Sequence, residues 1–339
     1  MNLGMLNTGR CLIIAEAGVN HNGRLDLALK LCDEAKKAGA DVVKFQTWKT
    51  ENIITRNVAM ADYQAVNTGV EESQFAMLKK LELSYEDFRK IKARCDEIGI
   101  VFSSTGDDPE SLDFLLELGI PFIKIGSGEI CNIPFLKYMG SKKMPVIMST
   151  GMSSLADVDI SLRTLLEAGA TSVTLLHCTT NYPCPYADVN LKAMLTLKEA
   201  FHLPVGYSDH TVGREVSVAA VALGATVIEK HFTLDCAMEG PDHAASTPPE
   251  AFAALVQAIR NTEIFLGDGA KMPTTAEKEI SKVVTKRIVA ARPIKAGETF
   301  TQDNLCVKRN DVGEPAIRWE QVLGRIAQKD YHHDEGILV

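Results

Sequence analysis

The sequence predicts an α/β fold, a TIM (β/α)8 barrel followed by a small β-rich domain. Short apolar runs of strand type alternate eight times with stretches in which apolar residues recur at helical spacing, over about 270 residues. Several of these stretches end at a glycine, as a left-handed helix C-cap favours. No Gly-x-Gly-x-x-Gly motif follows the first apolar run, which disfavours a dinucleotide-binding open sheet. Eight successive units fit a closed barrel better than a doubly wound sheet.

The individual elements are expected in chain order. Strands are expected in the apolar runs at residues 11–16, 41–45, 100–102, 122–125, 145–148, 172–176, 204–206 and 226–228. Helices are expected in the periodic stretches at residues 25–38, 108–118, 133–140, 154–168, 191–200, 215–223 and 249–266. A crossover of this length can join two neighbouring parallel strands.

One connection, residues 47–83, is much longer than the others. Residues 74–81 within it have the pattern of an additional helix. Connections of this length in compact domains are usually functional lids or disordered segments. We therefore expect a lid or another excursion that faces the substrate.

The composition changes after the eighth unit. Residues 1–268 are expected to form the barrel domain, and the polar residues 269–286 a linker. Residues 287–339 contain short strand and turn patterns and little helical periodicity, so a small β-rich domain is expected there. A core this small is marginal by itself, and we expect the domain to pack on another surface.

Charge and composition exclude several classes of function. The 339 residues carry a net charge of −8, which argues against nucleic acid as a partner. No apolar run approaches membrane-spanning length, and the amino terminus has no signal-peptide pattern. The eight cysteines form no Cys-x-x-Cys pair and are interpreted as reduced thiols of a cytoplasmic protein.

Polar side chains follow nearly every predicted strand, where TIM-barrel enzymes place their active sites. Lys44 and Lys124 interrupt apolar strands, and a buried lysine is costly unless it is paired with a charge or a ligand. Structural ion pairs are one explanation. Ammonium groups together with hydroxyl donors are also suited to binding phosphate, and the predicted phosphate-binding set is Lys44, Thr105, Lys124, Ser127, Ser149 and Ser208.

Two histidines, His210 and His231, follow the seventh and eighth predicted strands, and Glu129 follows the fourth. His210 and His231 are either buried structural residues or ligands of one metal ion. Two protein ligands leave positions for water and substrate, which favours Mn²⁺ or a related divalent ion over structural zinc. The carboxylate of Glu129 is available to move a proton.

Seven motifs in order resemble the bacterial sialic acid synthases. They are Ala15-Glu-Ala-Gly-Val-Asn-His-Asn-Gly23, Lys44-Phe-Gln46, Lys124-Ile-Gly-Ser-Gly-Glu129, Ser149-Thr-Gly-Met152, Gly206-Tyr-Ser-Asp-His210, Glu229-Lys-His-Phe232 and Glu239-Gly-Pro-Asp-His243. The last 50 or so residues resemble the antifreeze-like (SAF, β-clip) domain of that family, through Ile288-Val-Ala-Ala-Arg-Pro-Ile-Lys-Ala-Gly-Glu298 and Asp303-Asn-Leu305. The resemblance covers nearly the whole chain.

The resemblance implies an activity. Family members condense phosphoenolpyruvate with an N-acetylated amino-hexose and release phosphate. It implies N-acetylmannosamine as the acceptor and N-acetylneuraminic acid as the product. Glu129 and Glu16 would be catalytic, and His210 and His231 would hold the metal, with Mn²⁺ preferred and Mg²⁺ or Co²⁺ possible. The sugar would be bound by Gln46, Tyr182, Asp242 and Arg309.

The resemblance also implies a homodimer in which the small domain is exchanged, so that Arg309 reaches the site of the partner subunit. Asn310 stands where the family usually has proline, which puts the aim of Arg309 in question. Met238-Glu-Gly-Pro-Asp-His243 resembles the sialic and legionaminic members more than the pseudaminic ones. A legionaminic acid synthase that uses 2,4-diacetamido-2,4,6-trideoxymannose is therefore the alternative. A Schiff-base aldolase and a carbohydrate-binding protein are less favoured readings.

Overall fold

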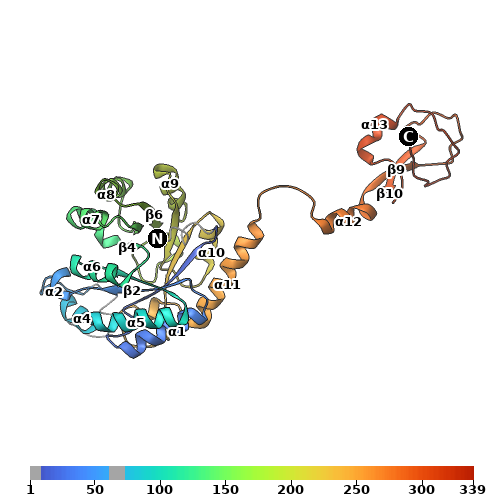
Figure 1. Ribbon diagram of the computed structural model, residues 1–339. Helices are drawn as coiled ribbons and strands as arrows, with labels where there is room; N and C mark the ends of the chain where they lie inside the picture. The colour runs from blue at the N-terminus through green and yellow to red at the C-terminus, as the bar shows by residue number, and fades with distance from the viewer. Residues whose placement is uncertain (1–8, 61–72) are drawn as a thin grey trace. The chain divides into compact units, whose positions relative to one another are not determined.

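Eight parallel strands close into a barrel in the computed structural model, which describes residues 9–60 and 73–339 (Figure 1). Neighbouring strands pair in sequence order, and β1 pairs with β8 to complete the ring. The strands are β1 (Leu12–Gly18), β2 (Val42–Thr47), β3 (Val101–Gly106), β4 (Ile123–Ile125), β5 (Pro145–Ser149), β6 (Ser172–His177), β7 (Val205–Asp209) and β8 (Val227–His231). The predicted TIM barrel is confirmed.

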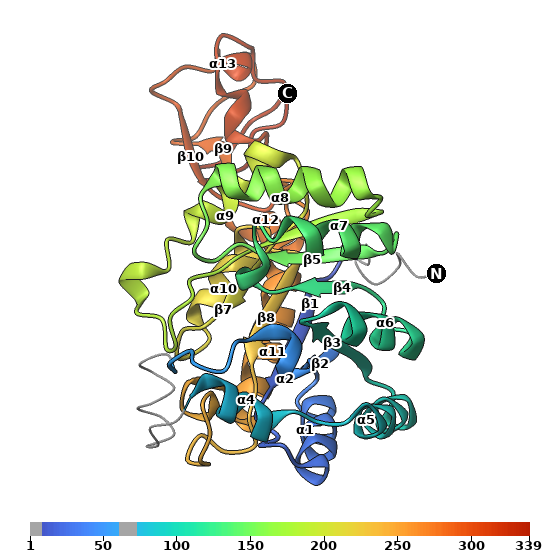
Figure 2. The same cartoon turned by 90° about the vertical axis from the view of Figure 1, so that its left-hand side faces the viewer.

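Helices surround the strands, as Figure 2 shows for α1, α5, α6, α7 and α8. The helices of this unit are α1 (Leu25–Lys37), α2 (Thr50–Ile53), α4 (Gln74–Leu81), α5 (Tyr85–Ile98), α6 (Pro109–Leu118), α7 (Ile133–Ser141), α8 (Leu155–Ala168), α9 (Lys192–Phe201), α10 (Glu215–Ala222) and α11 (Pro249–Leu266). Capping boxes at Ser84 and Ser154 begin α5 and α8, and left-handed glycines at 99, 119 and 169 end α5, α6 and α8.

The long second connection contains the predicted extra helix, which is α4. Ser73 caps it by accepting a hydrogen bond from the backbone N–H of Ala76. Met77 and Leu81 of α4 pack against Val19 and Trp48 in a small apolar cluster of their own. The expected lid falls partly on residues 61–72, which lie outside the described residues.

The barrel interior changes from apolar to polar along the strands. A lower layer is built by Leu12, Ile14, Val42, Phe122, Ile147, Leu176 and Val227. Side chains two residues apart in a strand point to the same face, so the residues two positions further along each strand form the next layer inside the barrel. That layer consists of Glu16, Lys44, Lys124, Ser149 and Glu229, all of them buried.

Strand register brings these polar residues to one level. Glu16 lies opposite both Lys44 of β2 and His231 of β8. Thr105 pairs with Lys124 of β4. The polar ends of neighbouring strands therefore converge at the carboxyl end of the barrel, because parallel strands all end on the same side.

The chain divides into two compact units, Met1–Gly267 and Asp268–Val339. The second unit has an antiparallel pair, β9 (Lys286–Ala290) and β10 (Leu305–Arg309), a short helix α13 (Trp319–Val322), and a core that includes Ile288, Phe300 and Tyr331. In the described residues, no helix is long and apolar enough to cross a membrane.

The segment expected to be a linker contains a helix that the sequence analysis did not predict, α12 (Thr275–Val284). The signal was present, because Thr274 and Glu277 form a capping box at its start. No residue of α12 is buried in the described structure, and Ile280 and Val283 are exposed. Its polar composition and the neighbouring glycines obscured the helical period.

Candidate active site

A cavity of about 210 Å³ opens at the carboxyl ends of the barrel strands. Its walls combine buried charges, hydroxyl groups, imidazoles and two glycines that leave backbone accessible. The residues that line it are Glu16, Lys44, Gln46, Thr105, Asp107, Lys124, Gly126, Ser127, Gly128, Ser149, Met152, Cys178, Thr180, Tyr182, Ser208, His210, Glu229 and His231.

The two lysines are the buried cations of this cavity, only 2 % and 3 % exposed. Lys44 donates to Thr105 Oγ1 at 3.0 Å, and its Nζ lies 2.5 Å from Glu16 Oε2. Lys124 donates to Ser149 Oγ at 2.8 Å and lies 3.4 Å from Glu229 Oε1. Since an isolated buried ammonium group is costly, these carboxylates are what allows both lysines to stay charged inside the barrel.

The two carboxylates respond differently to the same cluster. Burial raises the pKa of Glu16 to about 7, against the opposing effect of Lys44, and Glu229 raises it further. Burial acts in the same direction on Glu229, but Lys124 and Lys44 outweigh it and lower the pKa of Glu229 to about 2. Burial disfavours the charged form of Lys44, yet Glu16 and Glu229 leave its pKa raised. Glu229 is therefore a permanent anion, while Glu16 titrates near neutral pH.

The imidazoles of His210 and His231 lie next to each other in the cavity wall in an edge-to-face arrangement, with ring centroids 5.6 Å apart. Nδ1 of His210 is 2.7 Å from the carbonyl oxygen of Thr179, which as acceptor fixes the proton there and leaves Nε2 as a lone-pair donor. Burial lowers the pKa of His210, and burial with the nearby His210 lowers that of His231 to about 3. Both rings are neutral at physiological pH, the form that binds metals.

This pair fits a divalent ion. Nδ1 of His231 is buried without a hydrogen-bond partner among the described residues, and Asp242 Oδ2 lies 4.0 Å from it. In residues 9–60 and 73–339, no three His, Cys, Asp or Glu side chains are grouped to hold a metal ion. A metal bound here would thus have two imidazole ligands and would keep positions for oxygen ligands from water or substrate, unlike a closed structural zinc site.

A second cavity of about 150 Å³ adjoins the first and shares Gln46, Tyr182 and His231 with it. Gln46 donates to Glu16 Oε1 at 3.0 Å, and the ring of Tyr182 packs against both histidine rings. Burial raises the pKa of Asp242, which also lines this cavity, to about 6. The remaining wall is apolar and is formed by Val19, Met77, Leu78, Leu81 and Pro241.

Two residues of the predicted site are not among those that line the two cavities. Glu129 is in a 3-10 turn after β4, does not line the cavity, and accepts a hydrogen bond from Asn132 at 2.6 Å. Arg309 is exposed at the end of β10, in the second unit. Ser127 lines the cavity and accepts a hydrogen bond from the backbone N–H of Gly151 at 2.9 Å.

Two carboxylates that the sequence did not predict for the site also line the cavity. They are Asp107 and Glu229, the ion-pair partner of Lys124. Glu229 could have been found, because it lies two residues after the inward-facing Val227 in an apolar strand. Asp107 follows the last residue of β3, where it resembles an ordinary loop carboxylate beside Asp108.

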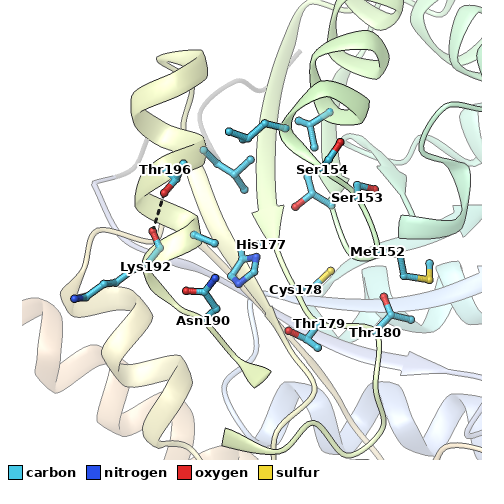
Figure 3. Close-up of a pocket in the computed structure, with 15 residues that line it drawn as sticks. Met152, Ser153, Ser154, His177, Cys178, Thr179, Thr180, Asn190, Lys192 and Thr196 are labelled. Atoms are coloured by element: carbon cyan, nitrogen blue, oxygen red, sulfur yellow. Dashed lines mark hydrogen bonds between the residues drawn. The ribbon is translucent and has the colours of Figure 1, made fainter. Parts of the chain in front are cut away.

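A larger cavity of about 790 Å³ lies between α8 and α9 and shares Met152, Cys178 and Thr180 with the first (Figure 3). His177 lines this cavity, and its Nε2 forms a hydrogen bond of 2.8 Å with the carbonyl oxygen of Val189. Its walls carry no carboxylate and a single lysine. The converging charges of the smaller cavity are absent from these walls, so we assign the chemistry to the smaller one.

A barrel with buried lysines, hydroxyl groups and neutral imidazoles at its strand ends is an enzyme of the class that binds a small phosphorylated anion. Comparison with known proteins identifies the family. Residues 31–271 match the NeuB family and residues 285–338 match the SAF domain. The chain belongs to the NeuB family, whose synthases condense phosphoenolpyruvate with sugars.

Two curated relatives are similar to this protein along almost the whole chain. An N,N'-diacetyllegionaminic acid synthase of Campylobacter jejuni is 48% identical, over 96% of this chain and 98% of the relative. The human N-acetylneuraminate-9-phosphate synthase is 37% identical, over 90% of this chain and 84% of the relative. A crystal structure of an N-acetylneuraminic acid synthetase from Leptospira borgpetersenii has a TM-score of 0.71 at 34% identity, covering 83% of this chain and 94% of that one.

Proposed function

We propose that this protein condenses phosphoenolpyruvate with 2,4-diacetamido-2,4,6-trideoxymannose, giving a legionaminic-type 2-keto acid and phosphate. N-acetylmannosamine, the acceptor first expected, becomes the alternative. The relatives named for legionaminic acid are 48% identical, against 37% for those named for N-acetylneuraminate-9-phosphate. The observation that carries the choice is the apolar wall of the second cavity.

Methyl groups distinguish the two acceptors. The diacetamido sugar carries a methyl on each of two acetamido groups and a third at C6, whereas N-acetylmannosamine has a single acetamido methyl. Met77, Leu78 and Leu81 supply apolar surface beside the polar groups of Gln46 and Asp242. Each buried methyl contributes about 0.8 kcal/mol. Two additional methyls therefore favour the diacetamido sugar by about 1.6 kcal/mol, or roughly tenfold.

Phosphoenolpyruvate is assigned to the first cavity. Lys44 and Lys124 supply positive charge, and the hydroxyls of Thr105, Ser127, Ser149 and Ser208 supply donors. These groups are already ordered by their own contacts, so that little reorganisation accompanies binding.

The aldehyde is assigned to the side of His210 and His231. A divalent ion, Mn²⁺ by preference with Mg²⁺ or Co²⁺ as alternatives, would be held by these two rings and would polarise the aldehyde oxygen. Gln46 lines both cavities and donates to Glu16 in the wall of the first, and both side chains would orient the sugar. The ring of Tyr182 packs against both imidazoles.

The reaction joins C3 of phosphoenolpyruvate to the aldehyde carbon, and the aldehyde oxygen takes a proton. Water adds to C2, and the C2–O bond to phosphate then breaks with its electron pair on the phosphate. One proton of the water ends on phosphate, and the other, released as the C2 hydroxyl becomes the keto group, balances the proton taken up by the aldehyde oxygen. Glu129, the base predicted from the sequence for the water, does not line the cavity and accepts a hydrogen bond from Asn132, so this step has no base assigned from the predicted set. Arg309 of a second subunit, in a homodimer, is proposed to complete the sugar site.

A Schiff-base aldolase is less well supported. A lysine nucleophile needs a lowered pKa, and the carboxylates around Lys44 raise it. Borohydride with substrate should leave the lysines unmodified, and a trapped lysine adduct would favour the aldolase.

The test is a phosphate-release assay with phosphoenolpyruvate and a panel of amino-hexoses. We expect kcat/KM to be about tenfold higher for the diacetamido sugar than for N-acetylmannosamine, from the two extra methyls. Leu78→Ala should reduce this ratio without changing KM for phosphoenolpyruvate, and Leu195→Ala, on α9 away from both cavities, should change neither. A preference for N-acetylmannosamine would identify the alternative acceptor. Sugar binding without phosphate release would indicate a carbohydrate-binding protein.

A further inference from the structure

Asp107 is a carboxylate of the cavity wall that no role assigned so far uses. It follows β3 and continues the strand, since its backbone N–H donates to the carbonyl oxygen of Thr47 at 3.0 Å. Its side chain is partly buried and lines the cavity with Thr105 and Lys44. Within the part of the chain that the structure describes, no hydrogen bond or ion pair engages its carboxylate oxygens.

The neighbouring Asp108 shows what a structural aspartate looks like here. It caps α6 by accepting from the backbone N–H of Ser111 at 3.0 Å, and it accepts from the Ser111 hydroxyl and the backbone N–H of Lys49. Both carboxylate oxygens of Asp108 therefore accept local hydrogen bonds, whereas those of Asp107 accept none in the described part of the chain. A carboxylate without such a partner in a substrate cavity is available to a ligand or to water.

The surroundings of Asp107 also suit proton transfer. Burial raises the pKa of Asp107 to about 7, Lys44 opposes this, and the carboxylates of Glu129 and Glu16 raise it further. A group that titrates near neutral pH both accepts and returns a proton efficiently. Glu16 has a similar pKa, but its two oxygens are engaged by Gln46 and Lys44.

The barrel order decides which proton Asp107 can reach. β3 and β4 carry Thr105 and Lys124 of the phosphoenolpyruvate set, whereas His210 follows β7 and His231 ends β8, on the other side of the ring. Asp107 therefore lies with the phosphorylated substrate, away from the aldehyde. The proton within its reach is that of the water at C2.

We propose that Asp107 takes the proton from the water that adds to C2 of phosphoenolpyruvate and returns it to the departing phosphate, a role that rests on the proposed condensation. The water oxygen forms its bond to C2, and its first proton moves to the Asp107 carboxylate. The C2–O bond to phosphate then breaks with its electron pair on phosphate, which receives that proton from Asp107. The second water proton leaves as the keto group forms and balances the proton taken up by the aldehyde oxygen.

The experiment measures phosphate release against pH in wild type, Asp107→Asn and Glu129→Gln. A base with a pKa near 7 gives a wild-type kcat that rises through pH 7, because the carboxylate must be ionised. Asp107→Asn is expected to lose about 10²–10⁴-fold in kcat and to lose this inflection, with no rise in KM for phosphoenolpyruvate. Glu129→Gln is expected to keep the inflection but to displace it to lower pH, since one neighbouring negative charge is gone.

Two further measurements keep the outcome decisive. Calorimetric binding of phosphoenolpyruvate to Asp107→Asn reports that the cavity is intact. Asp107→Glu, which keeps a carboxyl group, is expected to recover part of kcat and the inflection, and failure of this rescue counts against the role. The proposal is overturned if Asp107→Asn keeps wild-type kcat, or if Glu129→Gln abolishes the inflection while Asp107→Asn retains it. Wild type that releases no phosphate with any amino-hexose would instead refute the proposed function.

Discussion

Replacing Glu229 by glutamine tests the electrostatics of the buried cluster. The change removes a negative charge and keeps the shape; Lys124 loses its carboxylate partner, while Lys44 keeps Glu16. The pKa of Glu229 is about 2, against an ordinary value of 4.5. At about 1.4 kcal/mol per pKa unit, the ionised carboxylate contributes on the order of 3 kcal/mol to folding.

The direction of the pH dependence of stability follows from the linkage between proton binding and folding. A lowered pKa stabilises the folded state above the unfolded pKa, about 4.5, and this stabilisation is lost as the pH falls toward about 2. At neutral pH the whole contribution is present. Glu229→Gln should therefore lose about 3 kcal/mol at pH 7, equivalent to a Tm lower by roughly 6–12 °C in a domain of this size.

Thermal unfolding at pH 7 with and without inorganic phosphate is the assay. Phosphate should raise the Tm of Glu229→Gln more than that of wild type, because the anion replaces the missing charge beside the lysines. The matched control is Glu279→Gln, which breaks an exposed pair with Lys282 on α12 and should leave Tm unchanged. An unchanged Tm in Glu229→Gln would refute the assignment of Glu229 as the stabilising partner of Lys124.

Two further predictions concern the metal and the barrel packing. Chelation should abolish phosphate release, and added Mn²⁺ should restore it. His231→Ala should fold with wild-type Tm, but metal should not restore its phosphate release. Activity in fully metal-stripped enzyme would exclude the metal role. Gly206→Ala should lose about 1–3 kcal/mol in denaturant unfolding, because its Cβ would lie 2.3 Å from Val227 O and 2.7 Å from Leu176 Cδ2. Gly128→Ala, whose Cβ would meet nothing within 4 Å, is its stability control.

Much of the barrel could be predicted because its signals are local. Apolar runs, periodic helices and glycine C-caps each act over a few residues, and their repetition defines the closed sheet. The polar layer could also be predicted, since Lys44 and Lys124 stand two residues after inward-facing apolar side chains. Alternation along a strand fixes the face to which a side chain points.

The remaining features depend on contacts that no local pattern contains. Glu129 belongs to the same motif as Lys124 and Ser127, yet the 3-10 turn directs its carboxylate to Asn132. Asp107 and Asp108 are equivalent by sequence, and only packing shows that the helix cap uses one and leaves the other in the cavity. A turn residue can point in several directions, so its role is settled by the fold around it.

The buried cluster also accounts for how the proposed phosphate-binding site would be assembled before phosphate binds. Two lysines without ligand would have to be neutral or would destabilise the fold. Glu16 lies beside Lys44 and Glu229 beside Lys124, and these carboxylates offset the buried positive charges. An incoming anion competes with these carboxylates for the same ammonium groups. Glu16, which titrates near pH 7, is the partner that can lose its charge by taking up a proton, whereas Glu229 stays ionised and holds Lys124 in place.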